Sequence, residues 1–371
     1  MIRIDEIYNN TFWPFLKKNA PQTRMFFCDP PGRSDPESLF NFGINDIEYN
    51  YILFHDQEPI HMDIHRALFD ETAARNEDIA FYFDGIKNQA VVTSEYNSEF
   101  VEQVCSQYNW QHYYYFYHGW AALDWYRGYH RTWLMPLPEQ RKITRSFIAP
   151  NRIVGGKRDH RVLLLYHMFR NQVNNAWISC PRVCPAENIT IDQIAAKFSA
   201  RYPDITSVFK QAPIPMNFPG EVDHPMHSCW LSLFDESADS LAYVVTETVF
   251  QGRRQHLTEK TFKPICLQMP FVIAGTAGSL EYLRSYGFRT FGDLWDESYD
   301  TEIDDFVRLE KIGQLLKDLD NMSQRELNQL YQAARPAVEY NYKHFYGGTF
   351  ETLLWNELQQ MLTQIKNDFR V

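Results

Sequence analysis

The residues most able to do chemistry lie between two apolar segments in the second half of the chain. Glu247 ends a strand-like run of apolar residues. Thr258, Glu259 and Lys260 then open a segment with helical spacing. Thr258 is a suitable N-cap, which would put the other two residues in the first turn of a helix. Glutamate can accept hydrogen bonds from ribose hydroxyls and lysine can pair with phosphate, so this segment predicts a nucleotide-sugar site.

The order of the surrounding elements supports that prediction. Residues 271–274 form a second strand-like run after the helical segment, and Gly275 ends it. A helix that begins at the carboxyl end of a strand is where α/β proteins bind phosphates and sugars. An ordinary solvated first turn at Glu259 and Lys260 is the alternative, and the sequence leaves it open.

A basic loop in the middle of the chain is a second candidate for phosphate binding. Gly155 and Gly156 separate two apolar runs, with Arg152, Arg158 and Arg161 around them. The planar arginine side chain binds phosphate oxygens through two parallel hydrogen bonds, so these arginines are candidates to hold a diphosphate. The glycine pair does not match the G-x-G-x-x-G pattern, and no dinucleotide cofactor is expected. A solvated basic loop is the alternative.

These segments resemble the donor-binding half of inverting glycosyltransferases of the fucosyltransferase type. That family carries a strand ending in glutamate, a Thr-Glu-Lys segment that opens a helix, and a proline-led strand ending in glycine. Glu247, residues 258–260 and residues 270–275 match this order, within a region of roughly residues 240–300. The family usually has Phe-Glu-Asn at the first glutamate, where this chain has Val-Thr-Glu-Thr at residues 245–248. The segment at residues 258–264 also looks like the corresponding segment of phage-encoded transferases.

The resemblance implies an α/β fold with two facing Rossmann-like domains, of the GT-B type. Residues 1–148 would form the acceptor-side domain, residues 149–348 the donor-binding domain, and residues 349–371 a helix that packs back on the first domain. It also implies one displacement at the anomeric carbon, with inversion, without a required metal and with the nucleotide-sugar as co-substrate. Arg152, Arg158, Arg161, Glu247, Thr258, Glu259 and Lys260 would bind the donor.

Asp56 and Glu58 are the candidates for a catalytic base. They follow the apolar run at residues 51–53, and polar groups at the carboxyl end of a strand face the crevice of an α/β domain. An inverting transferase needs a base to take the proton from the attacking hydroxyl. We favour Glu58, because Pro59 restricts its backbone. A turn with a capping aspartate is the alternative.

An aromatic stretch is the candidate for acceptor contacts. Residues 113–117 are all aromatic, and aromatic rings with polar tips suit sugars or bases. The same run also reads as a buried β-strand, which is the favoured interpretation. The candidate acceptor-binding residues lie just beyond it: His118, Trp125, Tyr126 and Arg127.

The sequence gives little support for a metal site. His61 and His65 are four residues apart, but the residues between them do not match H-E-x-x-H. Asp318-Leu319-Asp320 is expected at the end of a helix on the solvated surface, and Cys180 and Cys184 have no second pair at zinc-like spacing. We therefore expect no metal.

Composition limits the class of protein. The chain has 371 residues, enough for two domains, and a net charge of −11, which counts against nonspecific nucleic-acid binding. Its N-terminus does not resemble a signal peptide, and no apolar run has the length of a membrane span. We expect a cytoplasmic protein, with the cytoplasm of a phage-infected host as one setting, and no obligate protein partner.

Apolar periodicity predicts alternating strands and helices. Residues 161–169 fit either a buried strand or a helix. Turns are expected at residues 29–32 and 84–85. Strands are expected at residues 49–54, 79–83, 90–93, 243–247 and 271–274, and helices at residues 98–108, 258–268, 279–286, 306–319, 323–340 and 350–369.

Several functions stay open at this stage. The acceptor could be a glycan or a hydroxymethylated pyrimidine in DNA, and the sugar and nucleotide are undetermined. A non-catalytic protein that binds a nucleotide or a glycan on the same fold is the alternative from a different class. The absence of a Walker A motif argues against a P-loop kinase or ATPase.

Overall fold

The computed structural model describes residues 2–21, 23–27, 50–63, 65–67, 69–70, 73–74, 88–127, 141–218 and 230–369. The predicted strand at residues 79–83 and the two predicted turns lie outside the described residues. The chain forms two compact units. Unit 1 comprises Met1–Asp124, Arg253–His256 and Glu351–Val371, and unit 2 comprises Trp125–Gly252 and Leu257–Phe350. The chain thus passes from one unit to the other at Asp124, where residue 148 was the expected boundary.

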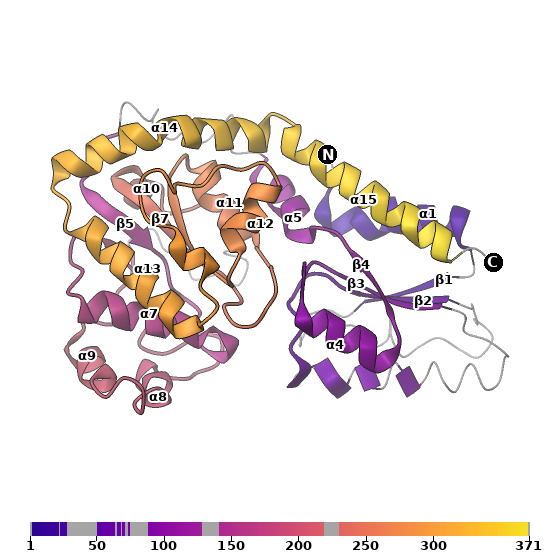
Figure 1. Ribbon diagram of the computed structural model, residues 1–371, viewed down its shortest axis with the longest axis horizontal. Coiled ribbons are helices and arrows are strands. Elements are labelled where there is room, and N and C mark those ends of the chain that lie inside the picture. Colours follow the sequence, from indigo (N-terminus) through magenta and orange to yellow (C-terminus); the bar gives the residue numbers. More distant parts are fainter. Residues whose placement is uncertain are drawn as a thin grey trace. The chain divides into compact units, whose positions relative to one another are not determined.

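Unit 1 contains a four-stranded parallel sheet (Figure 1). Its strands, in spatial order, are β1 (Thr23–Phe27), β2 (Asn50–His55), β3 (Asn88–Thr93) and β4 (Gln111–Tyr114). Every residue of β2 is buried, as expected for a central parallel strand. Because the strands are parallel, their carboxyl ends meet at one edge, where His55, Thr93 and Tyr114 stand in register.

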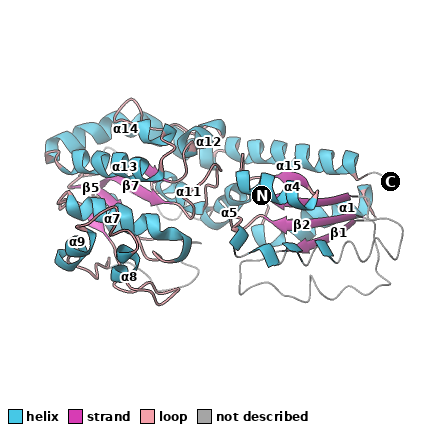
Figure 2. Ribbon diagram, turned by 60° about the horizontal axis from the view of Figure 1, so that its bottom comes forward, coloured by secondary structure: helices cyan, strands magenta, loops and turns pink. Residues whose placement is uncertain are grey.

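The helices of unit 1 come from both ends of the chain. The N-terminal segment contains a 3₁₀ turn (Ile4–Glu6), a π-helix (Tyr8–Phe12) and α1 (Trp13–Asn19). Helix α4 (Glu99–Tyr108) follows the N-cap Ser98 and packs Val101 and Val104 into the core. Helix α15 (Thr349–Asp368) follows one side of the sheet (Figures 1 and 2), and its Glu357 accepts a 2.7 Å hydrogen bond from the Phe116 amide.

Unit 2 contains a second parallel sheet, in the order β6-β5-β7-β8. The strands are β5 (Arg145–Ala149), β6 (Trp177–Ile178), β7 (Ser240–Thr246) and β8 (Phe271–Ala274). Helices α14 (Gln324–Tyr346) and α7 (Asp159–Arg170) lie on opposite sides of this sheet (Figures 1 and 2). The α/β class and the two Rossmann-like units expected from the sequence are therefore confirmed.

The remaining helices of unit 2 connect these strands. Helix α11 (Glu259–Cys266) links β7 to β8, and α12 (Ser279–Ser285) and α13 (Asp305–Asp320) follow β8. The shorter elements are a 3₁₀ turn (Gly156–Arg158), α8 (Ile191–Ala196), α9 (Ile205–Gln211), α10 (Phe234–Ala238) and a second 3₁₀ turn (Ser298–Thr301).

Two expectations about individual segments need comment. The ambiguous residues 161–169 form helix α7, whose residues from His160 to Met168 are all buried. A helix buried on every side has no amphipathic period, which is why periodicity did not decide. Asp320 was expected on the solvated surface, but it is buried. It accepts hydrogen bonds from the Asn174 and Asn175 amides.

Candidate functional site

Helix α11 begins at the carboxyl edge of the unit 2 sheet, as the sequence predicts. Thr258 has an extended backbone, and its side chain accepts a hydrogen bond from the Lys260 amide at 3.4 Å. This is the N-cap geometry. The helix start therefore faces the edge where the carboxyl end of β7 delivers Glu247.

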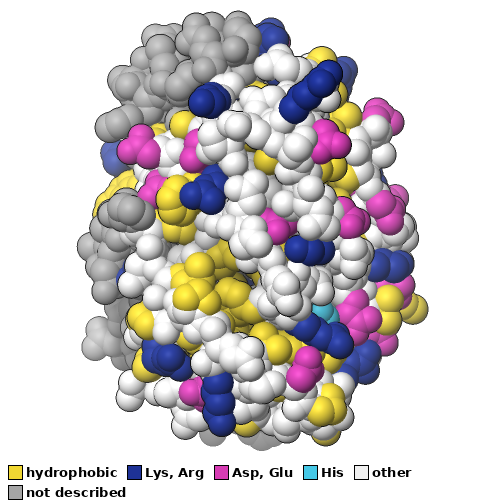
Figure 3. Space-filling view, turned by 90° about the vertical axis from the view of Figure 1, so that its left-hand side faces the viewer, with side chains coloured by type: hydrophobic (Ala, Val, Ile, Leu, Met, Phe, Trp, Pro, Cys, Tyr) yellow, Lys and Arg dark blue, Asp and Glu magenta, His cyan; other side chains and the backbone are white. Residues whose placement is uncertain are grey.

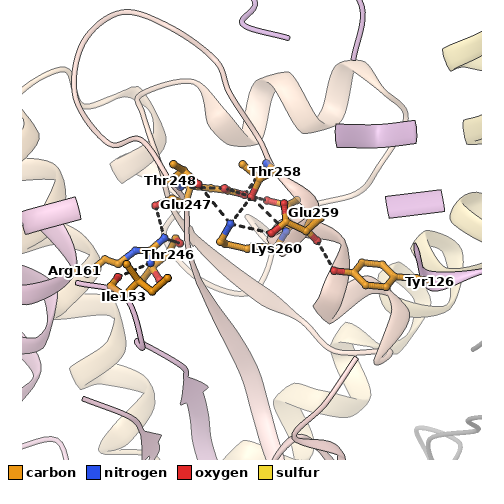
Figure 4. A network of polar contacts seen from close by, with 10 residues as sticks. Tyr126, Ile153, Arg161, Thr246, Glu247, Thr248, Thr258, Glu259 and Lys260 are labelled. Carbon is orange, nitrogen blue, oxygen red and sulfur yellow. Dashed lines mark hydrogen bonds and ion pairs between the residues drawn. The ribbon is translucent and has the colours of Figure 1, made fainter. Parts of the chain in front are cut away.

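The carboxylate of Glu247 holds this helix start in place (Figure 4). It accepts hydrogen bonds from the Thr258 amide at 3.1 Å and from the Thr258 hydroxyl at 2.6 Å. The Thr261 hydroxyl donates a third, at 2.6 Å. Glu247 is fully buried, so its negative charge sits beneath the positive end of the helix dipole, where it is stabilising. Its contacts are those of a group that positions the helix.

Lys260, in the first turn of α11, is a partly exposed cation. Its Nζ lies 2.9 Å from Glu259 Oε1, and the lysine side chain is 31% exposed while the glutamate is 5% exposed. The same ammonium group lies 3.2 Å from Thr258 Oγ1 and 3.4 Å from Thr248 Oγ1. A partly exposed ammonium group held by short contacts at a helix N-terminus is well suited to an anionic ligand.

Arg161 lies beneath the same edge, on α7 (Figure 4). Its guanidinium donates to the carbonyl oxygens of Ile153 at 2.7 Å, Thr246 at 2.8 Å and Glu247 at 3.1 Å. It is buried, its Nε has no hydrogen-bond partner, and it forms no ion pair with a carboxylate in the described part of the chain. Burial, with the nearby Arg158, lowers the pKa of Arg161 to about 9. The nearby carboxylates of Glu247 and Glu259 partly oppose this lowering. A buried cation that bonds to carbonyl groups and forms no direct ion pair favours an anion nearby.

A stack of three side chains supports the loop after Glu247. His160 packs face to face on Phe250, with ring centroids 5.0 Å apart, and Arg308 lies 4.1 Å from the centre of the Phe250 ring. His160 Nε2 also donates to the Glu247 carbonyl oxygen at 3.1 Å. Burial, together with the charge of Arg161, lowers the pKa of His160, so this histidine is neutral. No local sequence pattern pointed to Phe250 or Arg308, because the three stacked residues come from separate segments of unit 2.

The other two predicted donor arginines lie on the segment between β5 and α7. Arg152 and Arg158 are both half-buried. Gly155 and Gly156 lie between them, and a Cβ atom at either position would come within 2.5 Å of the Glu187 carboxylate. Glu187 is exposed and could move, but Gly156 also has a φ of +65°, a backbone conformation that favours glycine.

The two base candidates differ in their surroundings within unit 1. Asp56 is buried, and Tyr8 donates to both of its oxygens, at 3.0 and 3.1 Å. Tyr115 donates a further, short hydrogen bond to it. Glu58, two residues later, is half-buried. The carboxylate of Asp56 is thus occupied by two phenols, while Glu58 is open to solvent in part.

The histidines near these acids bond to one another. His55 Nε2 donates to His65 Nδ1 at 3.2 Å, and the His61 amide donates to the same nitrogen at 3.1 Å. Burial, with the nearby His65, lowers the pKa of His55 to about 3. Among the described residues no group of three or more His, Cys, Asp or Glu side chains is arranged to hold a metal ion.

A further buried acid at this edge was missed by the sequence analysis. Glu95 accepts a 2.6 Å hydrogen bond from Ser98 and a short one from the Ile60 amide, and it pairs with Arg254 at 3.5 Å. Its burial raises its pKa against the opposing effect of Arg254. Because Arg254 is more than 150 residues away along the chain, no local pattern pointed to this pair.

The four predicted acceptor residues differ in burial. His118 belongs to unit 1, is buried, and meets His256 edge to face with ring centroids 5.0 Å apart. Tyr126 belongs to unit 2, is fully buried, and donates to the Glu259 carbonyl oxygen at 3.4 Å. Trp125 and Arg127 are half-buried. The favoured interpretation of residues 113–117 as core is confirmed for most of them, since Tyr113, Tyr115, Phe116 and Tyr117 are buried.

Comparison with known proteins assigns no family to this chain. The sequence matches no protein-family model and no curated protein. A solved structure that resembles it is the alpha,alpha-trehalose 6-phosphate synthase of Burkholderia multivorans, at 12% sequence identity and a TM-score of 0.34. The match covers 85% of this chain and 67% of that protein. A likeness at this TM-score assigns neither fold nor function.

Among the described residues, no helix combines the length and apolar character that crossing a membrane requires.

Proposed function

We propose that this protein is a glycosyltransferase that moves a sugar from a nucleoside-diphosphate sugar to an acceptor hydroxyl. The observation that carries the proposal is the start of helix α11, where buried Glu247 fixes Thr258 and leaves Lys260 as a partly exposed cation. The site lies at the carboxyl edge of a parallel sheet, the usual position for nucleotide ligands in α/β folds. The resemblance of residues 258–260 to the donor segment of fucosyltransferase-type enzymes supports the same assignment.

In this proposal the donor residues divide into three groups. Lys260 contacts the diphosphate directly, and Glu259, whose carboxylate is already 2.9 Å from that ammonium group, accepts from the ribose or orients the lysine. Glu247, Thr258 and Arg161 act by position, because their polar atoms bond to the protein itself. Arg152 and Arg158 are half-buried on the preceding loop and are candidates for the outer phosphate.

Departure of the nucleoside diphosphate needs positive charge rather than a proton donor. A cation placed where charge develops stabilises the transition state most effectively in a site with little water. Lys260, the buried cation Arg161 and the N-terminus of α11 all contribute positive potential at this edge. We therefore propose a metal-independent reaction that proceeds by one displacement with inversion.

The base is proposed to come from unit 1. Glu58 is half-buried and follows β2, whereas the oxygens of Asp56 accept from Tyr8 and Tyr115. A general base must reach the proton that it removes, and Glu58 is the more accessible of the two. Asp56 then acts as a positioning residue for the end of β2.

The distribution of the described basic side chains favours a neutral acceptor over DNA. Of the basic residues between 141 and 161, Arg141 and Arg161 are buried and donate to main-chain carbonyl oxygens. On the face in Figure 3, the described basic side chains are interspersed with acidic ones and form no continuous stripe. Binding to DNA depends on several cations that neutralise phosphates, so a glycan acceptor is the better match.

Nucleotide binding is the first test. Thermal unfolding would be measured against nucleoside diphosphates and their sugars for the wild type, Lys260→Ala and Lys311→Ala. Lys311 is a matched control, because its Nζ also lies 2.9 Å from a glutamate and its side chain is 39% exposed. A ligand at about 100 times its Kd stabilises by roughly 2.7 kcal/mol. We expect one nucleotide to stabilise the wild type and Lys311→Ala, and to lose most of this effect with Lys260→Ala.

The outcomes separate the candidate functions. No stabilisation by any nucleotide or nucleotide-sugar would contradict the transferase proposal. Stabilisation without slow release of free sugar from the donor would favour a non-catalytic nucleotide-binding protein. Transfer to a hydroxymethylated pyrimidine in DNA, but to no glycan, would replace the glycan acceptor with DNA.

A further inference from the structure

The most exposed tyrosine at the carboxyl edge of the unit 1 sheet has no role in the site described above. Tyr96 is 52% exposed and follows the end of β3 by three residues. Its ring meets that of Tyr114, the last residue of β4, edge to face, with centroids 5.5 Å apart and planes at 64°. We call this pair of rings the aromatic corner.

The main chain that carries Tyr96 is fixed by hydrogen bonds. The amide and carbonyl groups of Tyr96 both bond to Gln255, at 3.0 and 2.9 Å. Asn97 then turns the chain through a left-handed backbone conformation, with φ of 48°, into the N-cap Ser98. The residue before Tyr96, Glu95, is anchored by Ser98 and Arg254. A large aromatic side chain that stays exposed on a fixed backbone is prepared for a ligand at little entropic cost.

The corner shares its edge with the proposed base. In register across the sheet, Tyr114 pairs with Thr93, and Thr93 pairs with His55. Glu58 follows His55 by three residues, as Tyr96 follows Thr93. The carboxyl ends of three neighbouring strands therefore present both the aromatic corner and the base candidate within one unit.

We propose that Tyr96 and Tyr114 form the stacking platform for a neutral sugar ring of the acceptor. This inference rests on the proposed transferase function and names its acceptor class. The apolar C–H face of a pyranose packs on an aromatic ring, and two rings at a steep angle contact a face and an edge of one sugar.

The charges around the corner select a neutral ligand. Arg253, which donates to the side chain of Asn97 next to Tyr96, is paired with Glu102 at 2.6 Å, and its amide donates to Glu99 at 3.0 Å. Arg254 is paired with Glu95. Each of these two arginines is matched by a carboxylate, so neither is left in excess to neutralise a phosphate backbone, as nucleic-acid binding requires. A nucleobase would stack on the same rings, but its phosphates would face Glu99 and Glu102.

The experiment measures oligosaccharide binding directly. Saturation-transfer NMR and calorimetry would use maltotetraose, cellotetraose, chitotetraose and N-acetyllactosamine, with single-stranded DNA of matched length as the competing probe. The variants are Tyr96→Ala, Tyr96→Phe, and Tyr340→Ala as a control, since Tyr340 is a 37% exposed tyrosine of unit 2. We expect at least one oligosaccharide to bind the wild type, Tyr96→Phe and Tyr340→Ala alike, and Tyr96→Ala to bind it about tenfold more weakly.

Each other result has a distinct meaning. Equal binding by Tyr96→Ala, or no binding of any oligosaccharide by the wild type, overturns the platform. Tyr96-dependent binding of DNA in place of sugars overturns the neutral-sugar assignment. Nucleotide stabilisation through Lys260, measured separately, reports on the transferase proposal. If it fails while Tyr96-dependent sugar binding persists, the platform stands and the protein is a glycan-binding protein without transferase activity.

Discussion

The hydroxyl of Thr258 lies 2.6 Å from a carboxylate oxygen of Glu247, so the N-cap of helix α11 is itself held by a fully buried acid. An N-cap threonine normally satisfies amide groups of its own helix. Here it also ties that helix to the end of strand β7, eleven residues earlier. The position of Lys260, two residues further along, follows from this contact.

Replacing Glu247 with glutamine should destabilise unit 2. The carboxylate accepts from the Thr258 amide and from the hydroxyls of Thr258 and Thr261. An amide side chain has one acceptor oxygen and turns an NH₂ group towards these donors, which should cost about 1–3 kcal/mol. Chemical denaturation would measure the loss. Glu326→Gln is the control, because Glu326 accepts from Ser323 in an exposed capping box and its loss should be much smaller.

The local part of this site could be predicted from the sequence. Thr258 as N-cap, the helix that follows and the strand at residues 271–274 all depend on near neighbours in the chain, and all are present. The fold class followed from the alternation of such elements. The hydrogen bonds that Glu247 accepts from Thr258 and Thr261 could not be predicted, because these residues become neighbours only when the intervening loop folds.

Burial was the other property that the sequence did not reveal. Arg161 was a phosphate candidate because of its type, yet its guanidinium bonds to three carbonyl groups, two of which lie on a segment more than 80 residues away. Tyr126 and His118 were acceptor candidates and are buried, whereas Tyr96 was not a candidate and is exposed. Whether an aromatic ring faces core or solvent depends on tertiary packing, which periodicity cannot report inside an all-aromatic run.

Lys260 and Arg161 should respond differently to substitution. Lys260→Ala removes a partly exposed ammonium group, so nucleotide affinity should fall at least tenfold with little change in Tm of the ligand-free protein. Arg161→Lys should lower both, because lysine cannot donate to all three carbonyl groups that arginine contacts. Thermal unfolding with and without nucleotide measures both effects. Unchanged Tm in ligand-free Arg161→Lys would contradict the positioning role.

Stability should decrease as the pH falls from about 6.5 towards 4. Burial lowers the pKa of His55 to about 3 and that of His167 to about 4, so both are neutral in the folded protein. Below the unfolded pKa of about 6.5 the unfolded chain binds more protons, and this favours unfolding by about 2 kcal/mol for each histidine at pH 5. The stabilisation is complete above pH 6.5 and is lost as the pH approaches the folded pKa.

The variant His167→Phe tests this assignment. His167 packs edge-on against Tyr202 with ring centroids 5.5 Å apart, and its Nε2 has no hydrogen-bond partner in the described part of the protein. Phenylalanine fits the same ring contact and cannot be protonated. Urea denaturation at pH 7.5, 6 and 5 would measure the free energy of unfolding. Between pH 7.5 and 5 this variant should lose about 2 kcal/mol less than the wild type, the contribution of one histidine. An identical pH profile would exclude His167 as a contributor.

Substitutions of Glu58 and Asp56 should have different effects, the first on turnover and the second on thermal stability. Glu58→Gln keeps the shape of a half-buried side chain but cannot accept a proton, so kcat should fall by about 10²–10⁴ with an unchanged donor Kd. Asp56→Asn leaves Tyr8 and Tyr115 with a weaker acceptor, so Tm should fall, as it should in Tyr8→Phe. Kinetics and thermal unfolding of the three variants give the comparison. If Asp56→Asn abolishes turnover at unchanged Tm while Glu58→Gln remains active, the base is Asp56, and its two tyrosine hydroxyls would then stabilise the carboxylate in its charged form.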